Sequence, residues 1–303
     1  MLKTLVALAS IGTTSFFIGT AAVANDTAKS GGFIVDEGAS ERIDVAGKLR
    51  MLSQRIPASA CFAHVGIQTD ATKATLAASA AEFSGILSAL QNGAPDIGIP
   101  SKESDFTVLR ALKTVDGVWQ PLQKNIKNVI DLGGYEWSVA YVANQSVPLL
   151  DESIWLSSVL IGEYSDPAVL LQADALTIDI AGRQRTLSQR IAKSACLYST
   201  GLETVYAGEE LIEARQHYDA SLRALRFGMP EAGIQASKDV QINSELDAIM
   251  VQWESVQPIL DAVIAQKSIT DADREEVYNV MNALTASMDT VVVHYNDESK
   301  LGL

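Results

Sequence analysis

The stretch AGKLRMLSQR at residues 46–55 is repeated as AGRQRTLSQR at residues 181–190, an offset of 135 residues (181 − 46). The match extends to IDVAGKLRMLSQRIPASACF from Ile43 and IDIAGRQRTLSQRIAKSACL from Ile178. The same offset pairs four later residues, Phe83, Gly93, Pro95 and Gly98, with Tyr218, Gly228, Pro230 and Gly233. An ordered series of matches at one offset indicates a tandem duplication. We place the first repeat at residues 36–165 and the second at residues 166–296, followed by a C-terminal tail at residues 297–303.

Each repeat has the pattern of four helices. Apolar residues recur at spacings of three and four through residues 38–68, 71–92, 105–131 and 136–163, and again through residues 167–206, 208–227, 239–266 and 271–296. The stretches NGAPDIGIP and FGMPEAGI interrupt the pattern at equivalent places in the two repeats. Strand signals are scarce. The sequence therefore predicts an all-α fold of two tandem antiparallel four-helix bundles.

The composition fits a globular helical protein with an acidic surface. Hydrophobic residues make up 48% of the chain and aromatic residues only 6%, which favours helices over a β-sandwich. The net charge of −14 argues against a nucleic-acid partner, because phosphates would be repelled. Any anion site must therefore be a local cluster of cations in a negative field.

The N-terminus has the pattern of an export signal. Residues 1–24, MLKTLVALASIGTTSFFIGTAAVA, combine an early lysine, an apolar run and small residues that end at Ala24. We predict cleavage after Ala24, a flexible segment at residues 25–35, and a periplasmic or secreted mature protein. An uncleaved membrane anchor is the alternative. No later segment has the ~20 uninterrupted apolar residues that a membrane span requires.

The repeated motif divides its helix into two faces. Val45, Leu49, Leu52 and Ile56 share one face, which should pack into the helix's own bundle. A second stripe, roughly opposite, contains Gly47, Arg50, Gln54 and Cys61 in the first repeat, and Gly182, Arg185, Gln189 and Cys196 in the second. The neighbouring Ser53 and Ser188 are further candidate ligand contacts. Arg55 and Arg190 should point towards solvent. This second stripe suits a contact between two helices that encloses something polar.

The chemistry of the stripe favours an anion. The guanidinium of arginine presents a planar fork of donors that a trigonal oxyanion or a carboxylate can meet with two hydrogen bonds. If the two motif helices face each other, Arg50 and Arg185 lie close together and an anion between them relieves their repulsion. The alternative is that each arginine pairs with a local acid such as Asp44 or Asp179.

The motif AGRQRTLSQRIAKSA resembles the signature of the PilJ-type sensor domain, which occurs in the periplasmic part of type IV pilus chemotaxis transducers. That domain is related to the sensor domains of nitrate- and nitrite-responsive histidine kinases. The resemblance implies that Arg50 and Arg185 bind the anion from two packed helices, and that Gly47 and Gly182 allow close approach. Unlike those receptors, this chain lacks a second membrane span and a signalling region, so we expect it to bind without transmitting a signal by itself. Pro57, where the second repeat has Ala192, should make the two halves of the site unequal.

Two functions agree with these observations. The first is an exported ligand-binding or sensory-accessory protein that captures a small anion, such as nitrate, nitrite or a small carboxylate, and presents it to a membrane receptor. The second is a protein-interaction module of a pilus or chemoreceptor system without a small-molecule ligand. We expect no enzymatic activity, no cofactor and no metal site, because His64, His217 and His294 are far apart and form no metal-ligand pattern.

The only two cysteines, Cys61 and Cys196, occupy equivalent positions beyond Arg50 and Arg185. If the motif helices pack around a pseudo-twofold axis, residues at the same phase approach each other, and an exported chain permits a disulfide. We predict a disulfide between the repeats. The alternative is a pair of buried free thiols inherited through the duplication.

Overall fold

The computed structural model describes residues 38–133, 135–164, 172–202 and 206–301. The predicted signal sequence at residues 1–24, the segment at residues 25–35 and the predicted start of the second repeat at Asp166-Pro167 lie outside this part. The helices of the first repeat are α1 (Ala39–His64), α2 (Thr69–Asn92), α3 (Phe106–Leu132), α4 (Glu136–Asn144) and α5 (Ser146–Tyr164). Those of the second are α6 (Gln172–Thr200), α7 (Ala207–Phe227), α8 (Val240–Ile264) and α9 (Asp271–Leu301).

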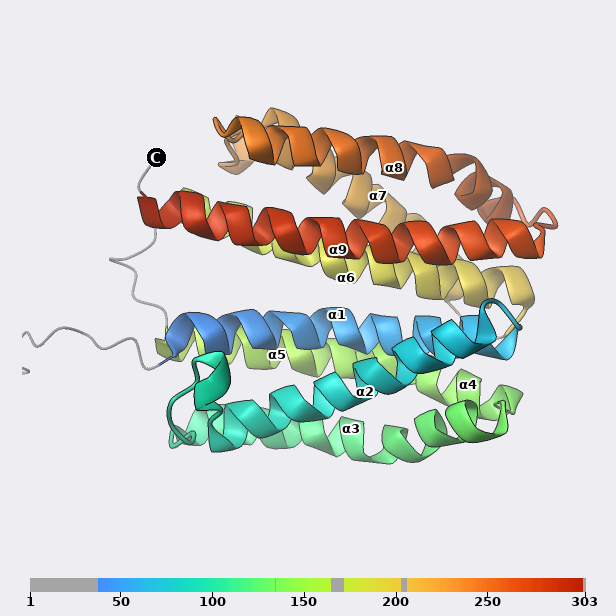
Figure 1. The fold of residues 1–303 in the computed structure, drawn as a ribbon, viewed down its shortest axis with the longest axis horizontal. Helices are drawn as coiled ribbons and strands as arrows, with labels where there is room; N and C mark the ends of the chain where they lie inside the picture. Colours follow the sequence, from blue (N-terminus) through green and yellow to red (C-terminus); the bar gives the residue numbers. More distant parts are fainter. Residues whose placement is uncertain (1–37, 134, 165–171, 203–205, 302–303) are drawn as a thin grey trace, which may run out of the picture. The chain divides into compact units, whose positions relative to one another are not determined.

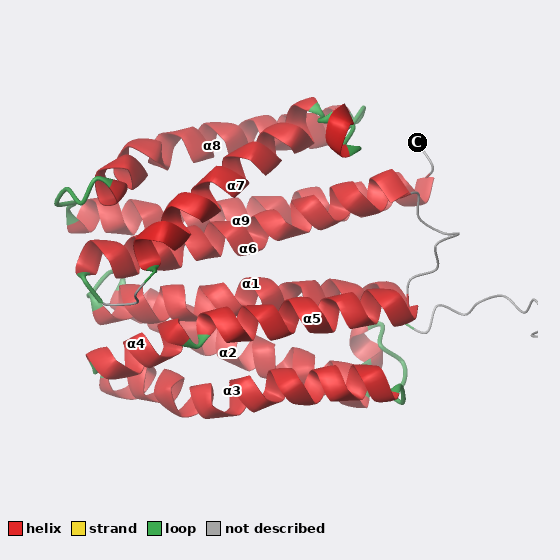
Figure 2. Ribbon diagram, turned by 180° about the vertical axis from the view of Figure 1, so that it is seen from behind, coloured by secondary structure: helices red, strands yellow, loops and turns green. Residues whose placement is uncertain are grey.

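The two repeats form two helical bundles that meet along α1 and α6. In the first bundle, α1 packs against α2 and α5, and α3 packs against α2, α4 and α5. In the second, α6 packs against α7 and α9, and α8 completes the bundle (Figure 1). Direct contact between α1 and α6 joins the bundles, as both views show (Figure 2). The predicted all-α fold of two tandem bundles is confirmed.

The turns between the second and third helices are the same in both repeats. Pro95–Ile97 and Pro230–Ala232 form short 3-10 turns, and each turn is closed by a single bridge, Ala94 to Ile99 and Met229 to Ile234. Asp105 and Asp239 then cap α3 and α8, because each carboxylate accepts hydrogen bonds from two backbone N–H groups of the first turn. Turn and cap chemistry therefore fixes where both third helices begin.

The core residues predicted from periodicity are buried. The apolar face of α1, formed by Val45, Leu49, Leu52 and Ile56, is at most 8% exposed. Trp119 packs on Phe83 with a ring-centroid separation of 4.4 Å, and Trp253 packs on Tyr218 at the same separation. The duplicated tryptophans thus anchor equivalent places in the two cores.

Several predicted boundaries differ from the structure. The segment predicted as one helix at 136–163 is divided at Gln145 into α4 and α5. Pro148 explains the division, because it lacks the N–H that would bond the carbonyl of Asn144. α6 ends at Thr200 rather than at 206, and α9 continues to Leu301, through most of the expected tail. By contrast, α1 continues without a break through Pro57.

None of the described helices has the combination of length and apolar character needed to cross a bilayer.

Candidate functional site

The two motif arginines converge where α1 and α6 pack against each other. A Cβ atom placed on Gly47 would lie 3.5 Å from Nη2 of Arg50 and 3.7 Å from Nη2 of Arg185. A Cβ atom placed on Gly182 would lie 3.5 Å from Nη2 of Arg185 and 4.0 Å from Nη2 of Arg50. Both guanidinium groups therefore border the space that the two glycines leave free of side chains. The structure brings together the four residues that the resemblance assigns to one site.

Carboxylates from both repeats neutralise these arginines. Nη1 of Arg50 lies 3.4 Å from Oδ1 of Asp179 on α6, and Nη1 of Arg185 lies 4.0 Å from Oδ1 of Asp44 on α1. Asp44 and Asp179 are equivalent in the duplication. The alternative of acid pairing therefore holds in part, but each pair crosses between the repeats instead of closing within one helix.

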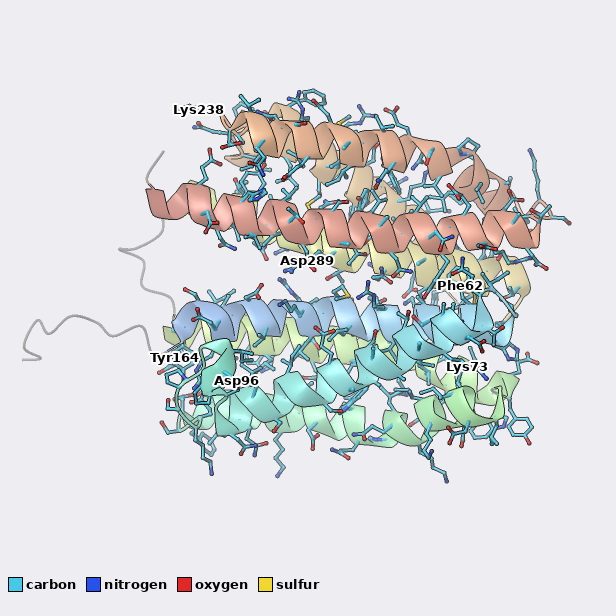
Figure 3. The ribbon with its side chains drawn as sticks, in the orientation of Figure 1. Phe62, Lys73, Asp96, Tyr164, Lys238 and Asp289 are labelled. Carbon is cyan, nitrogen blue, oxygen red and sulfur yellow. A yellow bond between two sulfur atoms is a disulfide. The ribbon has the colours of Figure 1, made fainter. Side chains whose placement is uncertain are left out.

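A third acid makes the site unequal. Nη1 of Arg185 also forms a close ion pair with Asp289, which lies on the side of α9 turned towards α1 (Figure 3). The register of the last helices is set by matching hydrogen bonds, from Gln54 to the carbonyl of Ser146 and from Gln189 to the carbonyl of Met281. In that register Ile154 occupies the position of Asp289 in the first repeat. Arg50 therefore has no carboxylate from its own bundle within salt-bridge distance in the described part of the chain.

Burial and charge act differently on the two guanidinium groups. The side chain of Arg50 is 15% exposed and that of Arg185 is 5% exposed. Desolvation lowers the pKa of Arg50, Asp179 raises it, and the nearby cations Arg183 and Arg185 lower it further. Nε of Arg50 is buried without a hydrogen-bond partner among the described residues. Arg50 thus keeps a donor that a ligand could use.

The amides and hydroxyls of the motif do not face the other repeat, which corrects our expectation for the second stripe. Gln54 donates to the carbonyl of Ser146 at 3.1 Å, and Gln189 donates to Oγ1 of Thr285 at 2.7 Å, each within its own bundle. The hydroxyls of Ser53 and Ser188 donate to the carbonyls of Arg50 and Arg185 at 2.7 and 2.9 Å. These four side chains support the motif helices internally.

The expectation that Arg55 and Arg190 point towards solvent is also wrong. Nη2 of Arg55 donates to Oδ1 of Asn282 on α9 at 3.2 Å, across the boundary between the bundles. Nη2 of Arg190 lies 3.0 Å from Oε2 of Glu213 on α7, within its own bundle. Other helices therefore cover α1 and α6 on more sides than the division into one apolar face and one opposite stripe predicted.

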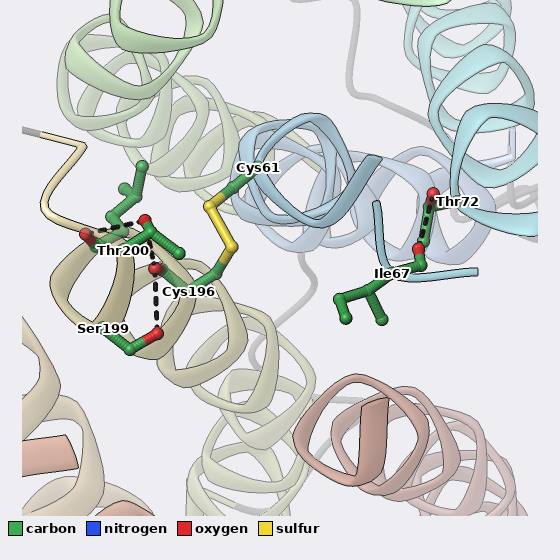
Figure 4. Close-up of a disulfide and its surroundings, with 7 residues drawn as sticks. Cys61, Ile67, Thr72, Cys196, Ser199 and Thr200 are labelled. Carbon is green, nitrogen blue, oxygen red and sulfur yellow. Dashed lines mark hydrogen bonds between the residues drawn. A yellow bond between two sulfur atoms is a disulfide. The ribbon is translucent and has the colours of Figure 1, made fainter. Parts of the chain in front are cut away.

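A disulfide and a buried lysine connect the bundles beyond the arginines. Cys61 of α1 and Cys196 of α6 are bonded, with their Cα atoms 6.2 Å apart (Figure 4). Nζ of Lys193, whose side chain is 2% exposed, lies 2.8 Å from Oε2 of Glu210 and donates to Oγ of Ser146 on α5 at 3.0 Å. Burial lowers the pKa of Lys193, and Glu210 raises it in part. This end of the interface is therefore held by a covalent bond and by the hydrogen bond from Lys193 to Ser146, while Glu210 neutralises Lys193 from within the second bundle.

The PilJ family model, described as the type IV pili methyl-accepting chemotaxis transducer N-terminal domain, matches residues 35–144 and 171–276. The chain belongs to the PilJ family. The first match covers α1 to α4, and the second covers α6 to α8 with the start of α9, so the protein carries the family's domain twice. PilJ domains are sensory, and they are typically periplasmic. No curated protein matches the chain.

The sequence pattern missed Asp289 and Lys193. Asp289 lies outside the family match and has no acidic counterpart in the first repeat. Lys193 replaces Ala58 on an otherwise buried face. A charged residue within an apolar stripe was the available signal in both cases, but its partners lie on other helices and cannot be identified from spacing alone.

Proposed function

We propose that the protein is an exported sensory-accessory protein that captures a small anion between Arg50 and Arg185 and presents the bound form to a membrane receptor. The supporting observation is that both guanidinium groups border the space beside Gly47 and Gly182. A planar oxyanion such as nitrate, nitrite or a small carboxylate matches a pair of arginine forks. Cleavage of the signal sequence after Ala24 and release into the periplasm belong to the same proposal.

The anion must compete with the acids already present. Asp44, Asp179 and Asp289 surround the two arginines, so protein carboxylates neutralise the site. Binding is therefore an exchange in which an anion takes the place of a carboxylate. Because the one carboxylate paired with Arg50 in the described part of the protein is Asp179, at 3.4 Å, Arg50 is the arginine that exchanges most readily.

This exchange supplies a route from binding to presentation. Asp44 and Asp179 each connect one repeat to the other, so their release loosens the contact between the bundles near the arginines. The disulfide and Lys193 hold the opposite end of the same interface. We propose that the bundles pivot about this fixed end and that a receptor distinguishes the two arrangements.

Calorimetry and thermal unfolding of residues 25–303 with nitrate, nitrite and acetate test the proposal. An anion at 100 times its dissociation constant should stabilise the folded protein by about 2.7 kcal/mol. Arg50→Gln and Arg185→Gln should each remove the effect. Asp289→Asn should strengthen binding, because it removes a competitor for Arg185.

Arg223→Gln is the matched control, because that arginine is exposed and its one ion pair within the described ranges is with Asp219 on its own helix. It should bind anions as the unmodified protein does. Equal anion binding in the unmodified protein, Arg50→Gln and Arg185→Gln would reject the site.

The second candidate, a protein-interaction module, is favoured by exposed aromatic side chains on the first repeat. Tyr135, Trp137 and Trp155 are 61%, 57% and 52% exposed, and the rings of Tyr135 and Trp137 stack at 6.4 Å. Exposed aromatic groups of this kind commonly mark contact surfaces. If no anion binds while Trp137→Ser abolishes association with the receptor's periplasmic domain, this function replaces the first.

A further inference from the structure

A groove lies between the bundles, apart from the arginine pair. It has a volume of about 390 Å³ and is bordered by α1, α2 and α9. Arg55 contributes from α1, Thr75, Ala78 and Glu82 from α2, and Asn282 from α9. A groove of this size suits a small metabolite.

Arg55 lacks the acidic partners of its counterpart. In the second repeat, Nη2 of Arg190 lies 3.0 Å from Glu213 and 3.9 Å from Glu210. The positions equivalent to Glu213 and Glu210 are Ala78 and Thr75, both in the wall of the groove. The duplication thus provides the same arginine twice, once neutralised by glutamates and once beside an open groove.

The donors of Arg55 are only partly used. Its Nη2 donates to the amide oxygen of Asn282 at 3.2 Å, and its Nε is buried without a hydrogen-bond partner among the described residues. No carboxylate of the described chain lies within salt-bridge distance of it. Burying an unpaired donor of a charged group costs free energy of folding unless a ligand accepts its hydrogen bond.

The same groove also carries an unpaired negative charge. Glu82 lines it from α2 and forms no ion pair within the described part of the protein. A guanidinium and a carboxylate in one groove match the two charges of a zwitterion, and the Asn282 amide adds neutral hydrogen-bonding capacity.

We propose that this groove binds a small α-amino acid. Arg55 binds the carboxylate of the amino acid, and Glu82 binds its ammonium group. Because the walls come from α2 of the first bundle and α9 of the second, the ligand bridges the two bundles. This site is independent of the proposed anion site and does not require Arg50 or Arg185.

The test is isothermal titration of residues 25–303 with each common L-α-amino acid, and with the 2-hydroxy acid that matches any binder. Arg55→Gln should weaken binding about 30-fold or more, as expected when one partner of a shielded charge pair is removed. Arg190→Gln is the matched control and should leave binding unchanged. The 2-hydroxy acid, which lacks the ammonium group, should bind more weakly than the amino acid, and Glu82→Gln should narrow that difference.

Ala78→Glu is the most specific variant, because it reproduces the arrangement of Glu213 beside Arg190. Ala78 is exposed, so the change should not disturb folding, which circular dichroism and urea unfolding verify. Amino-acid binding should be lost while nitrate binding is unchanged. The proposal would be overturned if no amino acid bound, or if the hydroxy acid bound as tightly as the amino acid. It would also be overturned if Ala78→Glu or Arg55→Gln bound the amino acid as well as the unmodified protein does, or if Arg50→Gln lost binding.

Discussion

The two repeats share a scaffold but treat their arginines differently. In the second repeat, Arg185 pairs with Asp289 and Arg190 pairs with Glu213, so both are neutralised within their own bundle. In the first, among the residues that the structure describes, Arg50 pairs only with Asp179 of the other repeat, and Arg55 bonds only to the amide of Asn282. Both repeats therefore have the two arginines, but only the second has acidic residues of its own bundle, Asp289 and Glu213, beside them in the described structure. The first repeat therefore has the more available cations.

The outer ends of the first helices show the reverse division. In the first repeat, Arg42 and Glu103 form a fully buried ion pair at 3.3 Å, and the hydroxyl of Tyr164 donates to Glu103. In the second repeat, the equivalent positions hold Thr177 and Ser237, and the hydroxyl of Ser237 donates to Glu298 at 3.1 Å. The next residue, Lys238, is exposed. Figure 3 labels Tyr164 and Lys238 at corresponding ends of the two bundles. Ion pairs within a bundle therefore lie at the end of the first repeat and beside the motif arginines of the second.

The largest expected effect comes from uncoupling the repeats. Closing a loop of 135 residues with the Cys61–Cys196 bond should stabilise the folded state by about 5 kcal/mol in the chain-entropy model. The double variant Cys61→Ala/Cys196→Ala should lose most of that free energy of unfolding, as measured by urea denaturation. It should also bind anions more weakly, because the two arginines are less well aligned.

The unmodified protein in the presence of a reductant is the control for the two substitutions. Its stability should fall by a similar amount under denaturing conditions that expose the sulfurs. Two freely alkylatable cysteines in the unreduced protein would contradict the link between the repeats.

The next effect in size concerns the buried ion pair at the end of the first bundle. Arg42→Met leaves the carboxylate of Glu103 buried without its cation, and should lower the free energy of unfolding by about 3–5 kcal/mol. Chemical denaturation followed by circular dichroism measures the loss.

Lys238→Met removes an exposed charge at the corresponding end of the second bundle and serves as the comparison. Because Lys238 is exposed, its replacement should change stability by no more than about 0.5 kcal/mol. Similar losses in the two variants would show that the contrast between the bundle ends has no energetic consequence.

Much of the fold followed from the sequence because the signals were local. The turns at Pro95 and Pro230 and the helical spacing of apolar residues recur at matching places in the two repeats. The division at Gln145 did not follow from hydrophobic spacing, because Pro148 interrupts its helix whereas Pro57 leaves α1 unbroken. A proline's effect on a helix depends on tertiary packing that the sequence does not state.

The site was harder to predict than the fold. Helix α1 is buried along much of its length, with residues 51–54 and 56–63 all buried, so hydrophobic periodicity could not separate the face towards α6 from the face towards α5. That is why Gln54 and Gln189 were assigned to the wrong contact. Arg50 and Arg185 were brought together correctly, but Asp289 could be found only from the position of α9.

The smallest expected effect tests whether the polar core of the second repeat is a weakness. Gln184 is fully buried, and neither its amide nitrogen nor its amide oxygen has a hydrogen-bond partner among the described residues. The first repeat has the apolar Leu49 at the equivalent position. An unsatisfied buried amide opposes folding, so Gln184→Leu should raise the free energy of unfolding by about 1–3 kcal/mol. The reciprocal variant Leu49→Gln should lower it by at least as much, because the amide would enter an apolar core. Urea denaturation of both variants decides the matter. A loss of stability in Gln184→Leu would show that the amide forms hydrogen bonds in solution. Gln184 would then stabilise the second core instead of weakening it.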